Sequence, residues 1–453
     1  MLTSFKAYDV RGRIPDELNE ALAYQIGEAY ATFVKPNKVV VGRDIRHSSS
    51  GLLAALTRGL TDMGVNVADI GLCGTEGVYF ATFAEAFDGG IMVTASHNPP
   101  DYNGMKFVRE QSRPISADSG LQTMRTLIEN SQLPGKASRP GNLSALDISR
   151  KYINHLLSYV KGTSLKPLKV VVNAGNGGAG LIVDQLEGKL PFEFVKINHA
   201  PDGSFPNGVP NPMLEENRSP TSEAIRRTKA DVGLAWDGDY DRCFFFDENG
   251  DFIEGYYLVG LLAQTFLRRH RGGRIVHDPR LTWNTIDIVQ QCGGQPVLCK
   301  SGHAFIKQRM REVDAVYGGE MSAHHYFRDF AYCDSGMIPW LLVLAVMSES
   351  GKTLSELLGE RQRLFPASGE INRSISAQMG NTKAVLARVQ EHYQARAKSI
   401  DFTDGLSMEF ERWRFNLRGS NTEPLVRLNV ESREQAALMQ DKTAEILRLL
   451  DGG

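Results

Sequence analysis

Three aspartates stand at alternate positions of one short loop, Asp237, Asp239 and Asp241 in the segment DGDYDR. The loop follows the apolar run 232–236, which is typical of a buried strand. Carboxylates at this spacing in a turn can converge on one hard cation, and Mg²⁺ combines few protein carboxylates with phosphate oxygens. The loop therefore predicts a magnesium site that also receives a phosphate group.

Two other interpretations of this loop stay open. A calcium EF-hand loop would use the same spacing, and Glu248 falls at its twelfth position. Against that interpretation, Arg242 occupies the sixth position, where the EF-hand requires glycine, and the flanks are strand-like rather than helical. The second alternative is a solvated acidic turn that binds no metal.

A second polar loop, TASHNP at 94–99, contains a serine beside a histidine, Ser96 and His97. Pro99 and Pro100 stiffen the backbone that follows. A serine hydroxyl needs a nearby base or metal to become nucleophilic, and a phosphorylated serine needs cations around it. We predict a fixed nucleophile at Ser96, whose phosphate would complete the shell of the metal; the alternative is a surface turn that happens to hold both residues.

Two later loops carry groups suited to a phosphorylated sugar. In GEMSAH, Glu320 and Ser322 present polar groups for sugar hydroxyls, and His324 could exchange protons near pH 7, unless its role is structural. We expect a structural role for the adjacent His325. In RGSNTEP, a guanidinium, hydroxyls and backbone N–H groups form a predicted phosphate nest, with a second arginine on the following strand. These groups are Arg418, Gly419, Ser420, Asn421, Thr422 and Arg427.

The elements that position these loops follow a repeated rhythm. Strands alternate with helical stretches within 38–99, 169–236 and 274–317, which implies parallel sheets. Ligands of open α/β sheets bind beyond the carboxyl ends of the strands, so the loops after these segments could share one cleft. We predict three related α/β domains with mixed sheets and a smaller C-terminal α+β domain, with bounds 1–146, 147–248, 249–367 and 368–453.

Composition and charge argue against a nucleic acid or membrane partner and against a secreted, disulfide-bonded protein. The 453 residues carry 51 basic and 53 acidic side chains, and a net charge of −2 gives no reason to expect a nucleic acid or membrane partner. Five cysteines without a CxxC pair are typical of reduced thiols, and the N-terminus shows no secretory signal. We therefore expect a cytoplasmic protein. The oligomeric state does not follow from the sequence.

The four motifs TASHNP, DGDYDR, GEMSAH and RGSNTEP occur in this order, one in each predicted domain. Together they resemble the α-D-phosphohexomutase superfamily over essentially the whole chain. This resemblance implies a four-domain fold, a phosphoserine carrier, a Mg²⁺ ion, a hexose phosphate substrate and activation by a hexose 1,6-bisphosphate. No nucleic acid or membrane partner is implied.

The resemblance also implies roles for individual residues. Ser96 matches the phosphoserine and a metal ligand, the three aspartates match the other metal ligands, and Arg242 would steady the transferring group. The remaining catalytic candidates are His97, Lys106 in YNGMK and His324, of which the last two are proton-transfer candidates. The implied substrate-binding residues are Tyr8, Arg11, Arg280, His303, Glu320, Ser322, Arg418, Ser420, Asn421, Thr422 and Arg427.

The third-domain segments GEMSAHHYFRDFAYCDSG and HDPRLTWN are most similar to bacterial phosphomannomutases. We therefore expect interconversion of mannose 6-phosphate and mannose 1-phosphate, which would supply GDP-mannose for surface polysaccharides. Two departures from the family pattern bear on specificity: Ala323 replaces a glycine, and Arg280 stands where a lysine is expected. The alternatives are a phosphoglucomutase or dual-specificity mutase, a phosphosugar hydrolase, and a non-catalytic sugar-phosphate sensor.

Overall fold

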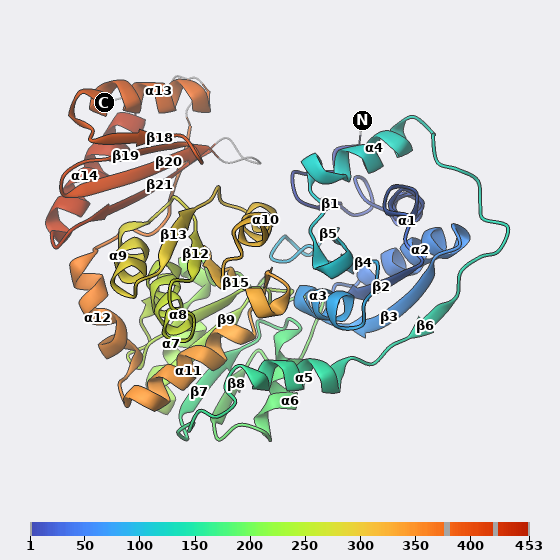
Figure 1. Ribbon diagram of the computed structural model, residues 1–453, viewed down its shortest axis with the longest axis horizontal. Helices are drawn as coiled ribbons and strands as arrows, with labels where there is room; N and C mark the ends of the chain where they lie inside the picture. Colours follow the sequence, from blue (N-terminus) through green and yellow to red (C-terminus); the bar gives the residue numbers. More distant parts are fainter. Residues whose placement is uncertain (1, 376–380, 420–424, 452–453) are drawn as a thin grey trace. The chain divides into compact units, whose positions relative to one another are not determined.

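The computed structural model describes residues 2–375, 381–419 and 425–451. The chain forms two compact units: the first comprises Met1–Phe252 and His324–Gly351, and the second Ile253–Ala323 and Lys352–Gly453. Figure 1 shows the strands and helices of both units, coloured along the chain from the N-terminus to the C-terminus. Among the described residues, none of the helices combines the length and apolarity needed to cross a membrane.

The first sheet has six strands and lies in the first unit. Strand β4 is antiparallel to β5, whereas β4, β2, β3 and β6 run parallel. In sheet order the strands are β1 (Val10–Arg13), β5 (Tyr102–Arg109), β4 (Gly89–Val93), β2 (Lys38–Arg43), β3 (Asn66–Leu72) and β6 (Leu143–Ala145). The helices are α1 (Glu20–Val34), α2 (Ser49–Asp62), α3 (Thr75–Ala84) and α4 (Leu121–Glu129), with 3-10 turns η1 (Glu110–Ser112) and η2 (Ala117–Ser119).

Helices α1 and α2 pack with their backbones in close approach. A Cβ added to Gly59 would lie 2.1 Å from the carbonyl oxygen of Tyr24, and one added to Gly27 would lie 2.5 Å from that of Leu56. Both positions therefore require glycine despite its low helix propensity. The pair contributes to a core that also contains Val39, Val41, Ile91 and Val93 of the central strands.

The second sheet also lies in the first unit. Strand β7 pairs in parallel with β8 and β9, and β10 is antiparallel to β9. The strands are β7 (Lys169–Asn173), β8 (Glu193–Ile197), β9 (Val232–Trp236) and β10 (Cys243–Phe246), with β11 (Phe252–Ile253) where the chain passes into the second unit. The helical elements are α5 (Ser149–Ser158), α6 (Ala179–Glu187), η3 (Glu215–Asn217) and α7 (Ser219–Thr228).

The third α/β domain has a parallel core in the second unit, where β12 pairs with both β13 and β14. Its elements there are α8 (Gly255–Arg269), β12 (Arg274–His277), α9 (Trp283–Gln291), β13 (Gln295–Leu298), α10 (His303–Val313), β14 (Tyr317–Gly319) and α12 (Leu354–Leu364). The first unit contains the antiparallel hairpin of this domain and the helix after it. These elements are β15 (His325–Phe327), η4 (Arg328–Phe330), β16 (Cys333–Asp334) and α11 (Ile338–Ser350).

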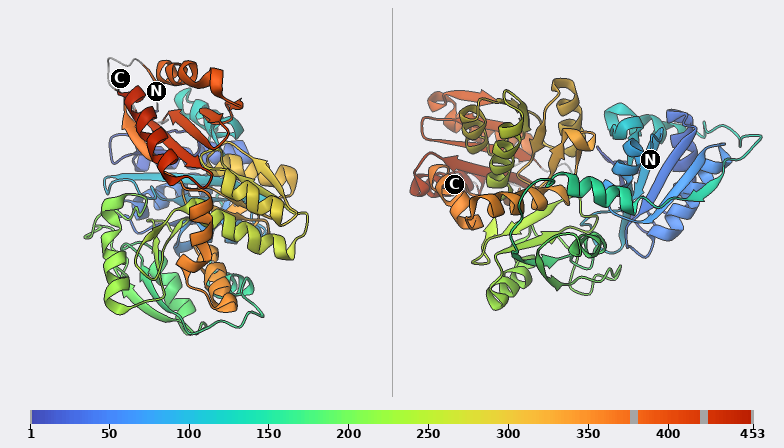
Figure 2. Two further views of the ribbon diagram at one scale, coloured as in Figure 1. Left: turned by 90° about the vertical axis from the view of Figure 1, so that its left-hand side faces the viewer. Right: turned by 60° about the horizontal axis from the view of Figure 1, so that its bottom comes forward.

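The C-terminal sheet is antiparallel throughout its order β17-β21-β20-β19-β18. Its strands are β17 (Ile371–Ser374), β18 (Ser399–Asp401), β19 (Leu406–Glu409), β20 (Trp413–Gly419) and β21 (Leu425–Ser432). Helices α13 (Thr382–Tyr393) and α14 (Ala436–Leu450) share one core with it, and both lie against this sheet in Figure 2. The turn η6 (Gln394–Arg396) follows α13.

This architecture confirms the predicted fold class of three mixed α/β domains followed by a C-terminal sheet domain. The exact domain bounds stay predictions. One strand lies further along the chain than expected: the third alternating segment was predicted to end at residue 317, whereas β14 occupies Tyr317–Gly319. The left-handed backbone of Asp314 (φ 48°) ends α10, so the next two residues form the connection to the strand.

A buried glutamate connects three segments of the first unit. Glu76 of α3 has no exposed surface, and its carboxylate accepts a hydrogen bond from the Tyr152 hydroxyl of α5. The backbone N–H of Met337, next to α11, lies 3.5 Å from the same carboxylate. Burial raises the pKa of Glu76 to about 8, so the side chain is protonated at neutral pH.

We predict that Glu76→Gln flattens the pH dependence of stability. In the wild type the folded state retains a proton that the unfolded chain loses above a pKa of about 4.3. The free energy of unfolding should therefore fall by about 1.4 kcal/mol per pH unit until the folded pKa is reached. Urea unfolding at pH values from about 5 to 8 measures this slope. Glu110→Gln, at a half-exposed glutamate, should retain the wild-type slope.

Candidate active site

Ser96 lies in the loop between β4 and β5 with its backbone in the left-handed region, at φ 49°. The residue is 4% exposed, and its N–H donates to Thr94 Oγ1 at 2.9 Å. A non-glycine residue in this conformation costs about 1–3 kcal/mol, and it persists only where the surrounding structure imposes it. The serine is therefore presented by a loop that the surrounding structure must hold in shape.

The guanidinium of Arg46 holds the serine loop. Its Nη2 donates to the carbonyl oxygens of Ser96 (2.9 Å) and Asn98 (2.6 Å), and its Nη1 to those of Pro99 (2.7 Å) and Tyr102 (3.0 Å). Arg46 is 2% exposed. Because one planar group binds four carbonyls of a single turn, it fixes the backbone of the nucleophile more tightly than isolated contacts could.

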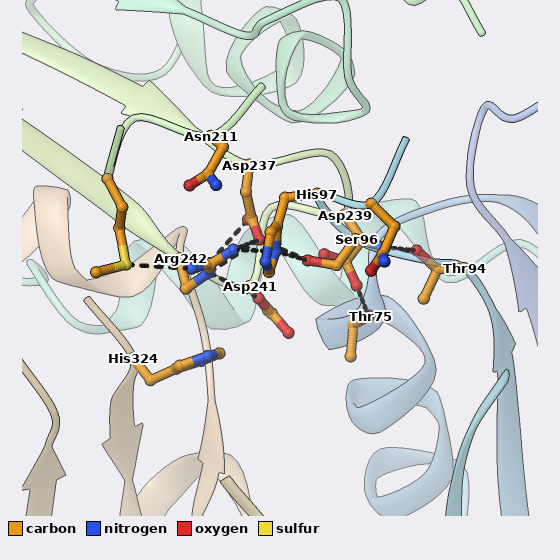
Figure 3. Close-up of polar contacts among 12 residues, drawn as sticks. Thr75, Thr94, Ser96, His97, Asn211, Asp237, Asp239, Asp241, Arg242 and His324 are labelled. Carbon is orange, nitrogen blue, oxygen red and sulfur yellow. Dashed lines mark hydrogen bonds and ion pairs between the residues drawn. The ribbon is translucent and has the colours of Figure 1, made fainter. Parts of the chain in front are cut away.

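The hydroxyl of Ser96 faces the aspartate loop, as Figure 3 shows. Its Oγ donates to Asp237 Oδ2 at 2.8 Å and lies 3.1 Å from His97 Nδ1. A Cβ added to Gly238 would lie 2.5 Å from the Ser96 carbonyl oxygen, so this glycine permits the close approach of the two loops. The predicted convergence of Ser96 with the aspartate loop is thus present within the first unit.

Arg242 connects the aspartate loop to His97. Its Nη2 lies 2.7 Å from Asp237 Oδ2 and 2.6 Å from His97 Nδ1. Because arginine is a donor, Nδ1 of His97 must be the unprotonated nitrogen. Burial and the charge of Arg242 hold the pKa of His97 well below its usual value. His97 is therefore a neutral acceptor beside the serine.

The other two aspartates share one lysine. Lys106 Nζ lies 2.7 Å from Asp239 Oδ2 and 2.6 Å from Asp241 Oδ2, and Thr75 Oγ1 donates to Asp239 at 2.5 Å. Burial would lower the pKa of Lys106, but the two carboxylates raise it above its usual value. Lys106 is therefore a cation at neutral pH. Burial and the neighbouring Asp239 raise the pKa of Asp241 to about 6.

The carboxylates fit a hard divalent ion. Asp237, Asp239 and Asp241 each place a ligand oxygen within 4.8 Å of the others. Asp239 Oδ1 and Asp241 Oδ1 are buried and accept no hydrogen bond from the described part of the chain. Buried carboxylate oxygens without donors are unfavourable unless a cation compensates them. The triad could therefore bind a metal ion next to Ser96, and the all-oxygen donor set suits Mg²⁺.

A second polar cluster lies in the second unit around Arg280. Its Nη2 lies 2.8 Å from Asp278 Oδ2, 3.1 Å from Ser322 Oγ and 3.4 Å from Glu320 Oε1. Arg280 and Glu320 are each 2% exposed, and Glu320 Oε1 accepts the N–H of Gly302 at 2.9 Å. This brings Arg280, Glu320 and Ser322 together, three of the residues predicted to bind the sugar.

Glu370 extends the second cluster to the C-terminal sheet. Its carboxylate lies 3.0 Å from Arg418 Nη2, 3.4 Å from Arg427 Nη1 and 3.5 Å from Arg280 Nη1. Burial would raise the pKa of Glu370, but these arginines, Arg280 foremost, hold it below its usual value. Arg418 was predicted in a loop but belongs to β20, directly opposite Arg427 of β21. The predicted ligands Ser420, Asn421 and Thr422 lie outside the described residues.

The remaining predicted residues occupy separate positions. Arg11 Nη1 donates to Asn98 Oδ1 of the serine loop at 2.6 Å. Tyr8 lies close to Arg11 in the chain and is half-buried. His303 is the first residue of α10. His325 is fully buried, and burial lowers its pKa to about 3, which fits the structural role expected for it.

Sequence reasoning did not identify Arg46, Thr75 or Glu370. Arg46 lies in the polar segment DIRHS at 44–48, which directly follows β2, a neighbour of β4 in the sheet. The carboxyl ends of neighbouring parallel strands lie at the same edge of a sheet. The sequence could therefore have predicted that this polar segment lies beside the serine loop. No local sequence pattern predicts the role of Glu370, because its partners lie up to 90 residues away along the chain.

The chain is similar to known proteins over its whole length. The phosphoglucomutase/phosphomannomutase family models match in four parts: alpha/beta/alpha domain I at 2–133, domain II at 150–250, domain III at 254–365 and the C-terminal domain at 370–447. A phosphomannomutase of Escherichia coli is 57% identical over 99% of each chain. A Xanthomonas campestris protein named phosphohexose mutases is 58% identical over the full length of both chains.

Solved structures extend the similarity to the fold. A phosphoglucomutase/phosphomannomutase family protein from Burkholderia thailandensis superposes with a TM-score of 0.88 at 32% identity, covering 100% of this chain and 98% of that one. A putative phosphomannomutase from Thermus thermophilus superposes over both full chains with a TM-score of 0.82 at 23% identity. At the latter identity, the likeness concerns the fold alone.

We predict that Arg46→Lys loosens the serine loop. A hydrogen bond to a charged group contributes about 1.5–3 kcal/mol, and an ammonium group cannot reproduce the four carbonyl contacts. Amide hydrogen exchange over residues 96–102 should accelerate at least about tenfold, which corresponds to about 1.4 kcal/mol. Arg43→Lys, whose guanidinium makes a 3.5 Å contact with the Asp44 carbonyl, is the control and should leave these rates unchanged.

We also predict that Asp239→Asn weakens binding of a divalent ion by at least about tenfold. The change removes one anionic ligand and disturbs the pairing with Lys106. Calorimetric titration with Mg²⁺ or Mn²⁺ measures the affinity. Asp251→Asn, at an exposed aspartate of the same compact unit, provides the comparison. Equal affinities in both variants would contradict metal binding by the triad.

Proposed function

Because the chain belongs to the phosphoglucomutase/phosphomannomutase family, we propose that it is a cytoplasmic phosphomannomutase that interconverts mannose 6-phosphate and mannose 1-phosphate. Family membership makes it an isomerase that transfers a phosphoryl group within a hexose phosphate. The observation that carries the proposal is the buried contact of Ser96 Oγ with Asp237 inside a carboxylate triad that could bind a metal. A supply of mannose 1-phosphate for GDP-mannose synthesis follows from the same proposal.

Ser96 is the proposed carrier of the phosphoryl group. In the first half of the cycle, the bond between Ser96 Oγ and phosphorus breaks while a sugar hydroxyl bonds to the phosphorus. The product is a hexose 1,6-bisphosphate, and the hydroxyl proton passes through a base so that Ser96 Oγ gains one. The second half reverses these steps with the other phosphoryl group. A hexose 1,6-bisphosphate should therefore activate unphosphorylated enzyme.

The residues around Ser96 are suited to charge neutralisation, which dominates phosphoryl transfer. Arg242 is a buried cation 2.7 Å from Asp237 Oδ2, the oxygen that also accepts the hydrogen bond of the Ser96 hydroxyl. Lys106 contributes a second buried positive charge beside Asp239 and Asp241. Asp237, Asp239 and Asp241 would hold Mg²⁺, which when bound neutralises phosphate oxygens. His97 accepts a hydrogen bond from Arg242 and orients this guanidinium.

The second cluster supplies the proposed sugar and phosphate contacts. Glu320 and Ser322 offer acceptors and a hydroxyl to sugar hydroxyls, and Arg280 fixes both through its Nη2. Arg418 and Arg427 are adjacent cations suited to the non-reacting phosphate. We further propose that Tyr8, Arg11, His303, Ser420, Asn421 and Thr422 contribute to substrate binding, as the family resemblance implies.

A dual-specificity phosphohexomutase is the second candidate. The 58% identical Xanthomonas campestris relative is named for phosphohexoses in general, whereas the 57% identical Escherichia coli relative is named for mannose. The two names differ at nearly equal identity. The ratio of kcat/KM values for mannose 1-phosphate and glucose 1-phosphate decides between these candidates.

We predict that Ser96→Ala reduces turnover of both sugar phosphates at least about 10⁴-fold, because the variant has no oxygen to carry the phosphoryl group. The assay compares mannose 1-phosphate with glucose 1-phosphate, each with and without a hexose 1,6-bisphosphate. Ser131→Ala, at an exposed serine, should behave as wild type. Circular dichroism and melting temperature verify that the fold of Ser96→Ala is retained.

Three results would contradict parts of this proposal. Substantial turnover by Ser96→Ala would remove Ser96 as carrier. Release of inorganic phosphate at the rate of substrate loss would identify a hydrolase. Binding of sugar phosphate without turnover by the wild-type protein would identify a sensor.

A further inference from the structure

We propose that Arg414 and Glu431 of the C-terminal sheet are positioning residues for Arg280, because together they fix the backbone of the loop that carries this arginine. The inference rests on the proposed mutase function, in which Arg280 belongs to the sugar-binding cluster, and it adds the residues that hold Arg280 in place. The observation that carries it is a set of buried hydrogen bonds from one cross-strand ion pair to the backbone of residues 279–283.

The ion pair belongs to a polar face of the C-terminal sheet. Arg414 of β20 and Glu431 of β21 are direct cross-strand partners, with Arg414 Nη1 2.8 Å from Glu431 Oε1. Arg418 and Arg427 form a second cross-strand pair on the same two strands, four residues away from the first. Side chains four residues apart in a strand point to the same face, so both pairs lie on one face of the sheet. The opposite face, which carries Phe415, contributes to the core shared with α13 and α14.

Arg414 binds the carbonyl groups of the Arg280 loop. Its Nη2 donates to the carbonyl oxygen of Pro279 at 2.8 Å, and its Nη1 donates to that of Arg280 at 3.1 Å. The side chain of Arg414 is 5% exposed. Because the guanidinium is planar and its donors point in fixed directions, these bonds restrict the rotation of two successive peptide groups. The backbone of Arg280 is therefore attached to β20.

Glu431 binds the N–H groups of the same loop where α9 begins. Its Oε1 accepts the N–H of Thr282 at 2.7 Å and lies 3.3 Å from the backbone nitrogen of Trp283. The first N–H groups of a helix have no partner within the helix. Thr282, the N-cap of α9, makes no side-chain capping hydrogen bond within the described part of the chain. A carboxylate 149 positions away therefore caps α9, and its negative charge suits the positive end of the helix dipole.

Tyr256 of α8 completes the network. Its hydroxyl donates to the Glu431 carboxylate and accepts the N–H of Asn284 at 2.6 Å. Glu431 has no exposed surface, and Tyr256 is 1% exposed. Hydrogen bonds in such a water-free environment strengthen one another, and the loss of one member leaves a buried polar group without its partner. The start of α9 is therefore held from α8 as well as from the C-terminal sheet.

The ion pair is better suited to direct Arg280 than to add stability. The attraction between two buried charges is largely offset by the loss of their hydration, so such a pair adds little to the free energy of unfolding. Arg280 reaches Ser322 Oγ at 3.1 Å with Nη2 and Glu370 Oε2 at 3.5 Å with Nη1. Because the donors of a guanidinium have a fixed fork geometry, both contacts require the backbone of Arg280 to stay in one place. The network of Arg414 and Glu431 supplies this restraint.

Amide hydrogen exchange of the full-length wild-type protein tests the network without an assay of activity. We expect the amides of residues 282–284 to exchange at least about a hundredfold more slowly than those of residues 436–438, after correction for intrinsic rates. The latter begin α14, whose N-cap Gln435 provides no side-chain cap among the described residues and whose first two residues are exposed. Equal exchange in the two segments would overturn the capping of α9 by Glu431.

Arg414→Lys tests the consequence for substrate binding. A lysine retains the charge beside Glu431 but lacks the fork that binds the carbonyls of Pro279 and Arg280. We expect KM for mannose 1-phosphate to rise at least about fivefold with kcat changed less than about twofold, because Arg280 serves binding rather than transfer. Arg412→Lys, at an exposed arginine two positions earlier, is the matched control and should retain the wild-type KM.

A double-mutant cycle distinguishes positioning from a general loss of structure. If Arg414 acts through Arg280, the rise in KM caused by Arg414→Lys should shrink to less than about twofold in an Arg280→Met background. Independent effects, whose factors multiply in the double variant, would overturn the inference. An unchanged KM in folded Arg414→Lys would also overturn it.

Tyr256→Phe provides a second variant if Arg414→Lys does not fold, which circular dichroism and melting temperature determine. It removes one hydroxyl and leaves the ion pair in place. We expect exchange of the Asn284 amide to accelerate at least about tenfold and KM to rise at least about twofold, and the latter only where Arg280 is present. A wild-type KM in this variant would then overturn the positioning role.

Failure of the mutase proposal gives a different result. Slow exchange at residues 282–284 in a wild-type protein that does not convert hexose phosphates would contradict the mutase function and support the attachment of the Arg280 loop. Full activity with fast exchange at these residues would contradict the network and not the mutase function.

Discussion

The first unit depends on the compensation of three buried carboxylates. Asp237 and Asp239 have no exposed surface and Asp241 has 2%. Moving an ion out of water costs several kcal/mol even after relaxation, so such a cluster is stable only beside opposite charges. Arg242 and Lys106 supply two of these charges. Within the described part of the chain, Asp239 Oδ1 and Asp241 Oδ1 accept no hydrogen bond, and this accounts for the fit to a divalent ion.

The residues around Ser96 must be held rigidly for the charges of this site to act on a phosphoryl group. Charges placed in a low-dielectric site act strongly only if they are fixed before the reaction. Arg46 fixes the backbone of the serine loop, Gly238 permits the aspartate loop to approach it, and Arg242 spans Asp237 and His97. Each of these contacts restricts motion around Ser96 Oγ. The left-handed backbone of Ser96 is a consequence of this restraint.

In the second unit, three arginines converge on one carboxylate. Arg280, Arg418 and Arg427 each lie within 3.5 Å of Glu370, and Arg280 also contacts Asp278 and Glu320. A planar guanidinium binds two oxygens at once, which suits carboxylate and phosphate equally. Arginine at position 280 reaches Glu320 and Glu370 with different nitrogens, which a lysine ammonium could not do with the same geometry. This gives a physical reason for the departure from the expected lysine.

The amino-acid sequence by itself determined the order of the strands and helices, the four-domain fold class and the positions of the serine and aspartate loops. These features follow from local periodicity and spacing, which neighbouring residues encode. Only the tertiary structure decided which groups compensate the buried charges. Arg46 meets the Ser96 carbonyl across 50 positions, Ser96 meets Asp237 across 141, and Lys106 meets Asp239 across 133. Such pairs depend on strand order and on how closely two loops approach, and no local pattern specifies either.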